Sequence, residues 1–343
     1  SRIRYPCYGN RCYESATITE KQSATSNGSG CHCDIQSGLV NMGSDNTFGG
    51  TIVPVVTPLT STYALDEAAV EKILAHLHKH QAHAFVLGTT GEAASLSWDM
   101  KRAYIKKAVK ARKTGMHLYA GISSNCVSES IAFANFCAAE GVDAVVATLP
   151  SYYTLTEAEM QAYFLQLASS ISLPLIVYNI PATTHMSIPL HVVDELSHHP
   201  HIVALKDSER SEERMRQALQ LWKNRKDFKY FLGWAAQSAN ALMEGCHGLV
   251  PSTGNLLPDI YATMWQAIAN GNRDEALAMQ RLSDEYGNLY QGGRTLGQSL
   301  WALKVLMQEE GLCAAHVMPP VQPLGEEEAQ KILQQYRQKK NKK

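Results

Sequence analysis

The sequence has no excess of charge of either sign. Its 343 residues include 31 Lys and Arg against 32 Asp and Glu, a formal net charge of −1, and the basic residues are spread along the chain. Binding to nucleic acid or to an anionic membrane depends on positive charge gathered on one surface. The composition therefore argues against both of these partners.

Long apolar runs are also missing. A membrane-spanning helix needs about 18 consecutive apolar residues, and no run in this sequence approaches that length. No short apolar segment with a cleavage site follows the first residues, so nothing indicates a secretory signal. We expect a soluble, cytoplasmic protein.

Cysteine is rare in the patterned part of the chain. Four of the eight cysteines lie near the N-terminus: Cys7, Cys12, Cys31 and Cys33. Zinc binding is one interpretation of these four, but neither the C-x4-C nor the C-x-C spacing is usual for zinc, and disorder is favoured. The other four stand singly in apolar sequence and are predicted to be small buried residues: Cys126, Cys137, Cys246 and Cys313.

Residues 1–46 have few branched aliphatic side chains and no sustained periodicity. Such a composition does not build a core, so we expect a disordered N-terminal extension or leader. A transit peptide is the alternative, because Arg2, Arg4 and Arg11 come early.

From Gly50 onward, a short branched-aliphatic run followed by a longer run of helical period recurs eight times. The short runs are nearly continuous in apolar residues, as in parallel strands covered on both faces. The predicted strands are 51–56, 84–87, 117–120, 144–148, 174–178, 202–206, 230–232 and 248–250. Start signals at Asp66, Ser97 and Thr156 introduce helices predicted over 68–80, 100–113 and 158–169.

Eight such alternations predict a (β/α)8 TIM barrel over residues 47–270. An open doubly wound sheet is the competing architecture, but it normally shows a G-x-G-x-x-G turn after its first strand, and none is present. Beyond Asn270 the pattern is helical only. We expect additional C-terminal helices within residues 271–343, packed beside the barrel or against a second subunit: 274–286, 296–310 and 326–338.

Unusual residues follow four of the predicted strands. They are Gly88-Thr89-Thr90-Gly91-Glu92 after the second, Pro150-Ser151-Tyr152-Tyr153 after the fourth, Tyr178-Asn179-Ile180-Pro181 at the fifth and Lys206-Asp207-Ser208 at the sixth. The carboxyl ends of the strands of a TIM barrel, with the loops that follow, form the active-site face. We therefore expect these four segments to meet at one site.

Lys206 closes the apolar run 202–205, where a charged side chain is costly unless it is solvated or paired. One interpretation is a stem that lies along the barrel with its ammonium in water. The other is an amine whose pKa is lowered by apolar walls, so that it attacks a ketone and forms a Schiff base. Its position alone does not decide between them.

Tyr178 ends the preceding strand, so its phenol is expected to reach the same volume as the amine of Lys206. A phenol there is able to move the protons that imine formation requires, or it caps the strand by bonding to backbone. Thr89 and Thr90 lie in a turn flanked by glycine. Their hydroxyls and amides are suited to hold a carboxylate, unless this is an ordinary tight turn.

Histidine does not indicate a metal site. Of the 13 histidines, only His185 lies near the expected active-site face. A metal-dependent aldolase needs His and carboxylates at several strand ends. No metal and no cofactor are therefore expected, although the metal-dependent aldolase stays an alternative.

The four segments together resemble the dihydrodipicolinate synthase and N-acetylneuraminate lyase family of pyruvate-type class I aldolases. The resemblance extends from about Gly50 to the last helices. It implies that Lys206 forms an imine with pyruvate or another 2-oxo acid and that Tyr178 is the acid and base beside it. It also implies that Thr89 links Tyr178 to Tyr152, which enters from the neighbouring subunit of a homodimer or homotetramer.

The same resemblance implies where substrate binds. Thr90 and the amides near it, including the Gly88 turn, would hold the carboxylate, and the Gly233 region would lie close to the second reactant. Ser252 remains available to hydroxyl groups of a substrate. In the synthases an Arg stands two residues after the Pro of the Y-N-x-P motif, where this chain has Thr183. A neutral hydroxyl forgoes a charge-assisted pair worth about 1.5 to 3 kcal/mol.

Sialic acid lyases have acidic residues just after the Gly of the seventh strand, where this chain has Ala235 and Ala236. We therefore expect a Schiff-base lyase or synthase that condenses or cleaves a 2-oxo acid with an aldehyde, with the aldehyde unidentified. The alternatives are a 2-keto-3-deoxy sugar acid aldolase or dehydratase of the same family, and a non-catalytic sensor of 2-oxo acids.

Overall fold

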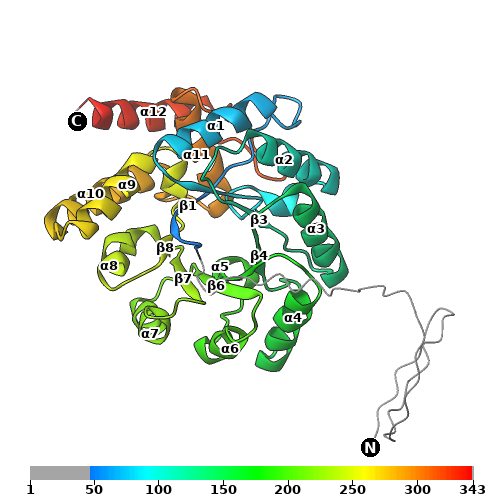
Figure 1. The fold of residues 1–343 in the computed structure, drawn as a ribbon. Coiled ribbons are helices and arrows are strands. Elements are labelled where there is room, and N and C mark those ends of the chain that lie inside the picture. Colours follow the sequence, from blue (N-terminus) through cyan, green and yellow to red (C-terminus); the bar gives the residue numbers. More distant parts are fainter. Residues whose placement is uncertain (1–46, 342–343) are drawn as a thin grey trace, which may run out of the picture. The chain divides into compact units, whose positions relative to one another are not determined.

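The computed structural model describes residues 47–341. Eight parallel strands close into a barrel in which each strand pairs with the next in sequence and β8 pairs with β1 (Figure 1). The strands are β1 Gly50–Pro54, β2 His83–Val86, β3 Leu118–Gly121, β4 Ala144–Thr148, β5 Leu175–Asn179, β6 Ile202–Asp207, β7 Lys229–Leu232 and β8 Gly248–Leu249. The predicted (β/α)8 TIM barrel is confirmed, and every predicted strand overlaps an observed one.

Helices surround the strands on the outside of the barrel (Figure 1). They are α1 Glu67–Lys79, α2 Trp98–Ala111, α3 Val127–Glu140, α4 Glu157–Ser169, α5 Pro181–Thr184, α6 Leu190–Leu196, α7 Glu212–Trp222, α8 Ser238–Met243 and α9 Pro258–Ala269. Asp66, Ser97 and Thr156 are the N-caps of α1, α2 and α4, and each side chain accepts a hydrogen bond from the first turn. The helices begin directly after these caps, one or two residues earlier than predicted.

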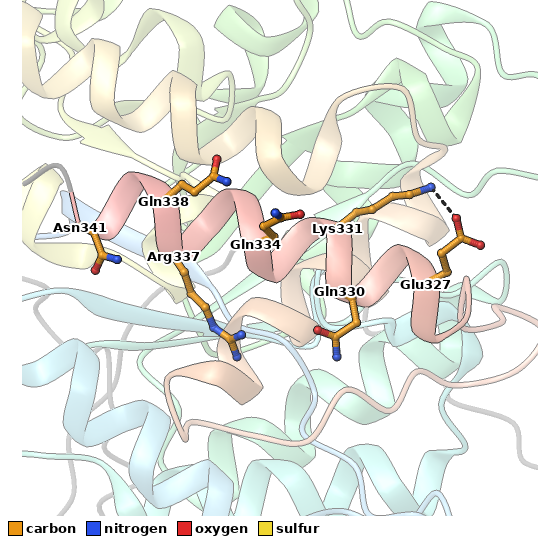
Figure 2. A pocket seen from close by; sticks show the side chains of 7 residues that line it. All are labelled: Glu327, Gln330, Lys331, Gln334, Arg337, Gln338 and Asn341. Carbon is orange, nitrogen blue, oxygen red and sulfur yellow. Dashed lines mark ion pairs between the residues drawn. The ribbon is translucent and has the colours of Figure 1, made fainter.

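Three helices follow the barrel: α10 Arg273–Gln291, α11 Leu296–Glu309 and α12 Glu326–Lys340. α10 packs against α8, α9 and α11, and α12 packs against α10 and α11. α12 buries Ile332 and Tyr336. Its outer face carries polar side chains (Figure 2): Glu327, Gln330, Lys331, Gln334, Arg337, Gln338 and Asn341. The C-terminal helices therefore cover one side of their own barrel.

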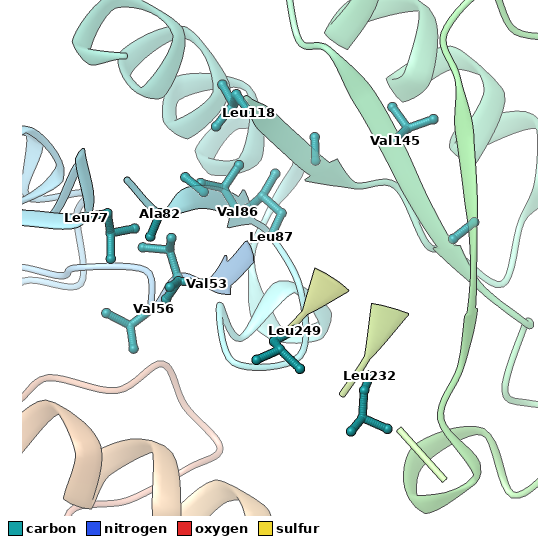
Figure 3. Packing of buried hydrophobic residues seen from close by; sticks show 14 of the residues in the cluster. Val53, Val56, Leu77, Ala82, Val86, Leu87, Leu118, Val145, Leu232 and Leu249 are labelled. Atoms are coloured by element: carbon teal, nitrogen blue, oxygen red, sulfur yellow. The ribbon is translucent and has the colours of Figure 1, made fainter. Parts of the chain in front are cut away.

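Buried apolar residues form two layers. The outer layer lies between the strands and the helices and includes Val53, Val86 and Leu118, which Figure 3 shows among their neighbours. The inner layer fills the barrel and includes Phe85 and Tyr178. Because side chains alternate along a strand, Phe85 faces inward and its neighbour Val86 outward. This alternation directs the inner residues at the strand ends toward the active-site face.

One expectation about cysteine is wrong. Cys137, Cys246 and Cys313 are buried, but Cys126 is exposed. Cys126 is the N-cap residue of α3, in the loop that follows β3. Loops at this end of the barrel lie at the surface, so a small side chain there is not drawn into the core.

Two further expectations concern other parts of the chain. The predictions for residues 1–46, including the first four cysteines, lie outside the described residues. Within residues 47–341, no helix combines the length and the apolar character needed to cross a bilayer.

Candidate active site

Tyr178 and Lys206 face each other across neighbouring strands. The register of β5 and β6 places their Cα atoms as direct partners, and each residue is 5% exposed. The Lys206 Nζ lies 3.7 Å from the centroid of the Tyr178 ring and 4.7 Å from that of Phe85. The amine thus contacts two aromatic rings of the inner layer of the barrel.

Burial lowers the pKa of Lys206 below its usual value, and the opposing influence of the Tyr178 oxygen does not restore it. Removal from water disfavours the charged ammonium. The free amine, which is the form that attacks a carbonyl carbon, is therefore more populated than in an exposed lysine.

In the pKa of Tyr178, by contrast, the effect of burial is outweighed. Burial raises the pKa of its phenol, but the charge of Lys206 and hydrogen bonds from Ser208, Thr89 and Lys206 together bring the pKa below its usual value. These donors stabilise the phenolate. A phenol with a lowered pKa exchanges protons more readily near neutral pH, which is what an acid and base beside an amine must do.

The turn after β2 brings Thr89 to this pair. The Gly91 amide donates to the Gly88 carbonyl at 3.1 Å, and the Glu92 amide donates to the Thr89 carbonyl at 3.1 Å. A Cβ on Gly88 would lie 2.7 Å from Cε1 of Phe85. Glycine at this position therefore allows the Phe85 ring to lie where it contacts Lys206.

A buried polar network ties the ends of β5 and β6 together. The side-chain nitrogen of Asn179 donates to Asp207 Oδ1 at 2.9 Å, and Asn179 Oδ1 accepts from the backbone amide of Ile188 at 3.0 Å. Arg214 Nε donates to Asp207 Oδ2 at 2.6 Å. Asn179 and Asp207 directly follow the two residues that face each other, so this network holds the strand ends in register behind them.

Asp207 is 1% exposed, and burial raises the pKa of its carboxyl although Arg214, Asn179 and the Glu209 amide act against this. The charge of Arg214 offsets part of the cost of placing a carboxylate there. The network is therefore sensitive to the loss of either charged partner.

A cavity of about 570 Å³ opens beside Tyr178, and Lys206 itself does not line it. It is lined by Phe85, Gly88, Thr89, Tyr178 and Thr183 among the residues already discussed. The rest of the lining is mixed: its polar side chains include Ser123, Ser124, Asn125, Thr148 and Ser151, and its apolar side chains include Trp98, Leu296, Leu300 and Val321. Its size and mixed lining suit a small-molecule ligand.

Other predicted site residues lie elsewhere. Tyr152 is 78% exposed and stacks edge-on against Tyr153, with ring centroids 4.9 Å apart. Ser252 Oγ lies 2.7 Å from the Tyr290 hydroxyl of α10, and the Gly233 amide donates to the Asp207 carbonyl. Among the described residues that line the cavity, Tyr152, Ser252, Gly233 and Thr90 are not present.

Over the described part of the chain, no group of three or more His, Cys, Asp or Glu side chains is arranged to hold a metal ion. A second hollow lies on the outer face of α12 (Figure 2), where side chains of that helix alone line it. It contains none of the predicted site residues.

The sequence profile of the dihydrodipicolinate synthetase family matches residues 47–339. The chain belongs to this family. Its members are class I aldolase-type lyases that act on small molecules and use no metal or external cofactor. The chain is therefore a lyase of the class I aldolase type.

Relatives within the dihydrodipicolinate synthetase family carry two kinds of name. A 4-hydroxy-tetrahydrodipicolinate synthase of Dichelobacter nodosus is 29% identical over 282 residues, 81% of this chain and 93% of the relative. An uncharacterized DapA-like lyase of Pyrococcus abyssi is 28% identical over 281 residues, 81% of this chain and 94% of the relative. A solved dihydrodipicolinate synthase from Bacteroides thetaiotaomicron has a TM-score of 0.80 at 27% identity, covering 84% of this chain and 98% of that one.

Sequence reasoning missed several residues of this family member's site. In the sequence Phe85 is an ordinary apolar residue of a predicted strand, and nothing there indicates that it contacts Lys206. Ser208 follows Lys206 by two residues and nothing in the sequence gives it a role, yet it contributes a hydrogen bond to Tyr178. Lys304 lies in an apolar helical run, and a lone lysine there was an available signal of a buried charge.

Proposed function

We propose that this family member is a Schiff-base-forming lyase or synthase that condenses or cleaves a 2-oxo acid such as pyruvate with an aldehyde, through Lys206. The observation that carries the proposal is the amine of Lys206, which is buried against two aromatic rings, has a lowered pKa and faces Tyr178 across β5 and β6. A solvated lysine, the other interpretation of the sequence, would be neither buried nor lowered in pKa.

The free amine attacks the keto carbon and forms a carbinolamine, which loses water to give the imine. Tyr178 accepts the proton released by the attacking nitrogen and returns it to the departing hydroxyl. The protonated imine then withdraws electrons, so that Tyr178 removes a proton from the adjacent carbon and the resulting enamine bonds to the aldehyde carbon. The aldehyde oxygen takes up the proton, and water hydrolyses the new imine to release the product and the Lys206 amine. Cleavage is the same sequence in reverse.

Tyr152 is proposed to complete the relay from a second copy of the chain. Tyr152 and Tyr153 are 78% and 74% exposed, and they follow Pro150 and Ser151, which line the cavity. An exposed aromatic pair of this kind is typical of a surface that is covered by a partner. Thr89, which donates to Tyr178, would be the next member of the relay in a homodimer or homotetramer.

A 2-keto-3-deoxy sugar acid aldolase or dehydratase is the second candidate. The hydroxyl and amide groups in the lining of the cavity favour it, because they are suited to hydrogen-bond the hydroxyls of a polyol substrate. Thr183 on the same cavity offers a hydroxyl and no charge. Substrate-binding roles for Gly88, Thr90, Gly233 and Ser252 remain part of the proposal.

Trapping with borohydride tests the imine. Protein incubated with pyruvate and reduced should gain the mass of a reduced pyruvate adduct on the peptide that contains Lys206. Lys206→Ala should lose both the adduct and turnover, whereas Lys101→Ala, which removes the amine of a lysine that lines the cavity, should keep the adduct. An unmodified Lys206, under conditions that trap a known class I aldolase, contradicts the proposal.

Two further arms separate the alternatives. Pyruvate binding that survives Lys206→Ala, with no turnover in the wild-type protein, would instead indicate a sensor. Full activity in EDTA removes a metal-dependent aldolase. A panel of aspartate semialdehyde, N-acetylmannosamine, glyoxylate, glyceraldehyde and 2-keto-3-deoxy sugar acids then identifies the second reactant.

A further inference from the structure

A lysine is buried in the middle of α11. The helix is apolar around it, and every residue from Ser299 to Met307 is buried. The side chain of Lys304 is 0% exposed and that of its partner Glu92 is 2% exposed. Lys304 Nζ lies 2.5 Å from Glu92 Oε1, so a charge pair with no access to water joins a C-terminal helix to the turn after β2.

Both members of the pair make further hydrogen bonds to the chain that follows α11. Lys304 Nζ donates to the His316 carbonyl at 2.6 Å, and Glu92 Oε2 accepts from the Met318 amide at 2.6 Å. Cys313 is the other titratable group that influences the pKa of Lys304. Glu92 borders the cavity, but both of its carboxylate oxygens are occupied by these partners.

Stability alone does not account for such a pair. The free-energy cost of removing two charges from water offsets most of their attraction. Apolar residues of similar volume are therefore often as stabilising as a buried ion pair. Losing one partner, in contrast, leaves an uncompensated buried charge. The pair is therefore better suited to fix one geometry than to add net stability.

The geometry that it fixes is that of the catalytic turn. Glu92 has a left-handed backbone, with φ 55° and ψ 26°, and its amide donates to the carbonyl of Thr89. On the other side, the buried Thr57 hydroxyl donates to the Gly91 carbonyl at 2.6 Å. Buried contacts thus hold the turn at Gly91 and Glu92, two and three residues after Thr89, whose hydroxyl reaches Tyr178.

We propose that Glu92 and Lys304 are positioning residues, through which the C-terminal helical segment holds Thr89 against Tyr178. This inference rests on the proposed function, because it acts on the proton transfer that Tyr178 performs. Neither side chain touches substrate. The C-terminal helices, which lie outside the barrel, then take part in catalysis by holding one turn.

The proposal predicts an altered pH dependence. The groups that set the pKa of Tyr178 are Lys206, Ser208 and Thr89, and the Thr89 hydrogen bond lowers it. If the turn shifts and that hydrogen bond is lost, the phenol titrates at higher pH. The limb of the kcat profile to which Tyr178 contributes should move upward by about one pH unit, the shift expected for one hydrogen bond to a charged group.

The test compares Glu92→Gln/Lys304→Met with the wild-type protein. We expect kcat to fall about 10- to 100-fold, as for a small misplacement of a reacting group. KM for the 2-oxo acid should change by less than about twofold, borohydride trapping at Lys206 should persist, and the pH limb should move. Lys304→Arg, which keeps the charge, should restore part of the activity. If the double variant does not fold, Glu92→Asp, which keeps the charge but shortens the side chain, provides the perturbation, and a fall in kcat with a shift of the pH limb is again expected.

Leu306→Ala on the same helix is the matched control, because it opens a cavity in the core without touching the pair. It should lower Tm and leave kcat and its pH profile unchanged. Adding Thr89→Val to the double variant should cost little more, since both changes act through the same hydroxyl. A folded double variant with wild-type kcat and pH profile overturns the inference. Failure to trap an imine in the wild-type protein instead overturns the proposed function.

Discussion

Replacing Arg214 by leucine should weaken both the barrel and its site. Arg214 is 11% exposed in its side chain, and its Nε lies 2.6 Å from Asp207, which is 1% exposed. Arg214→Leu leaves a buried carboxylate without its cation, a change that typically costs about 3 to 5 kcal/mol of unfolding free energy. For a domain of this size the Tm should fall by about 5 to 15 °C.

The loss should depend on pH. Burial already raises the pKa of Asp207, and without Arg214 the pKa rises further. A carboxyl whose pKa is raised in the folded state contributes stability at low pH that is lost as the pH rises through the folded pKa. The difference in Tm between the variant and the wild-type protein should therefore be larger at about pH 8 than at about pH 5.

Calorimetry and turnover measured on the same preparations check this prediction. Arg216→Ala is the matched control, since Arg216 lies on the same helix and pairs with Glu212 at the surface, where an ion pair contributes little. Asp207→Asn/Arg214→Leu should recover much of the lost Tm, because the fully buried carboxylate is then gone and Glu209, the other partner of Arg214, is partly exposed. A single variant as stable as the wild-type protein at high pH, or a double variant no better than the single, would refute the reasoning.

Two other predictions follow from the structure. Tyr152→Phe should lower kcat by at least about 100-fold without lowering Tm. Mixing this variant with Lys206→Ala protein should restore some activity, because hybrid sites would then contain both intact residues. No recovery despite proven subunit exchange would count against the supply of Tyr152 from a neighbouring subunit. Burial and, to a lesser extent, the charge of His117 lower the pKa of His83 to about 4, so the free energy of unfolding should fall as the pH drops from about 6.5 toward that value. Urea titrations of His83→Gln should show a smaller fall. A fall as large as that of the wild-type protein would contradict this prediction.

The barrel could be predicted from sequence because parallel strands covered on both faces have a distinct pattern. The apolar runs at 144–148 and 202–206 contain no alternation, and caps such as Thr156 mark the helices between them. The strand order then follows from the connections alone. Boundaries were less accurate, since α10 continues to Gln291, five residues beyond the predicted end.

The site was only partly predictable. Strand ends identify Tyr178 and Lys206, because a register of adjacent parallel strands brings equivalent positions together. The pairing of Glu92 with Lys304 joins residues 212 positions apart, and no spacing rule relates them. The exposure of Cys126 and the stacking of Tyr152 on Tyr153 depend on how loops leave the barrel, which local patterns do not determine.

The facing amine and phenol have a consequence for how the protein titrates. Each group's proton affinity depends on the charge of the other, so protons leave the two in joint steps whose midpoints belong to neither residue alone. A proton can pass between nitrogen and oxygen without any exchange with solvent. Substituting either residue should therefore displace both limbs of a bell-shaped rate profile, and a single limb that moves alone would mean that the two behave as independent acids.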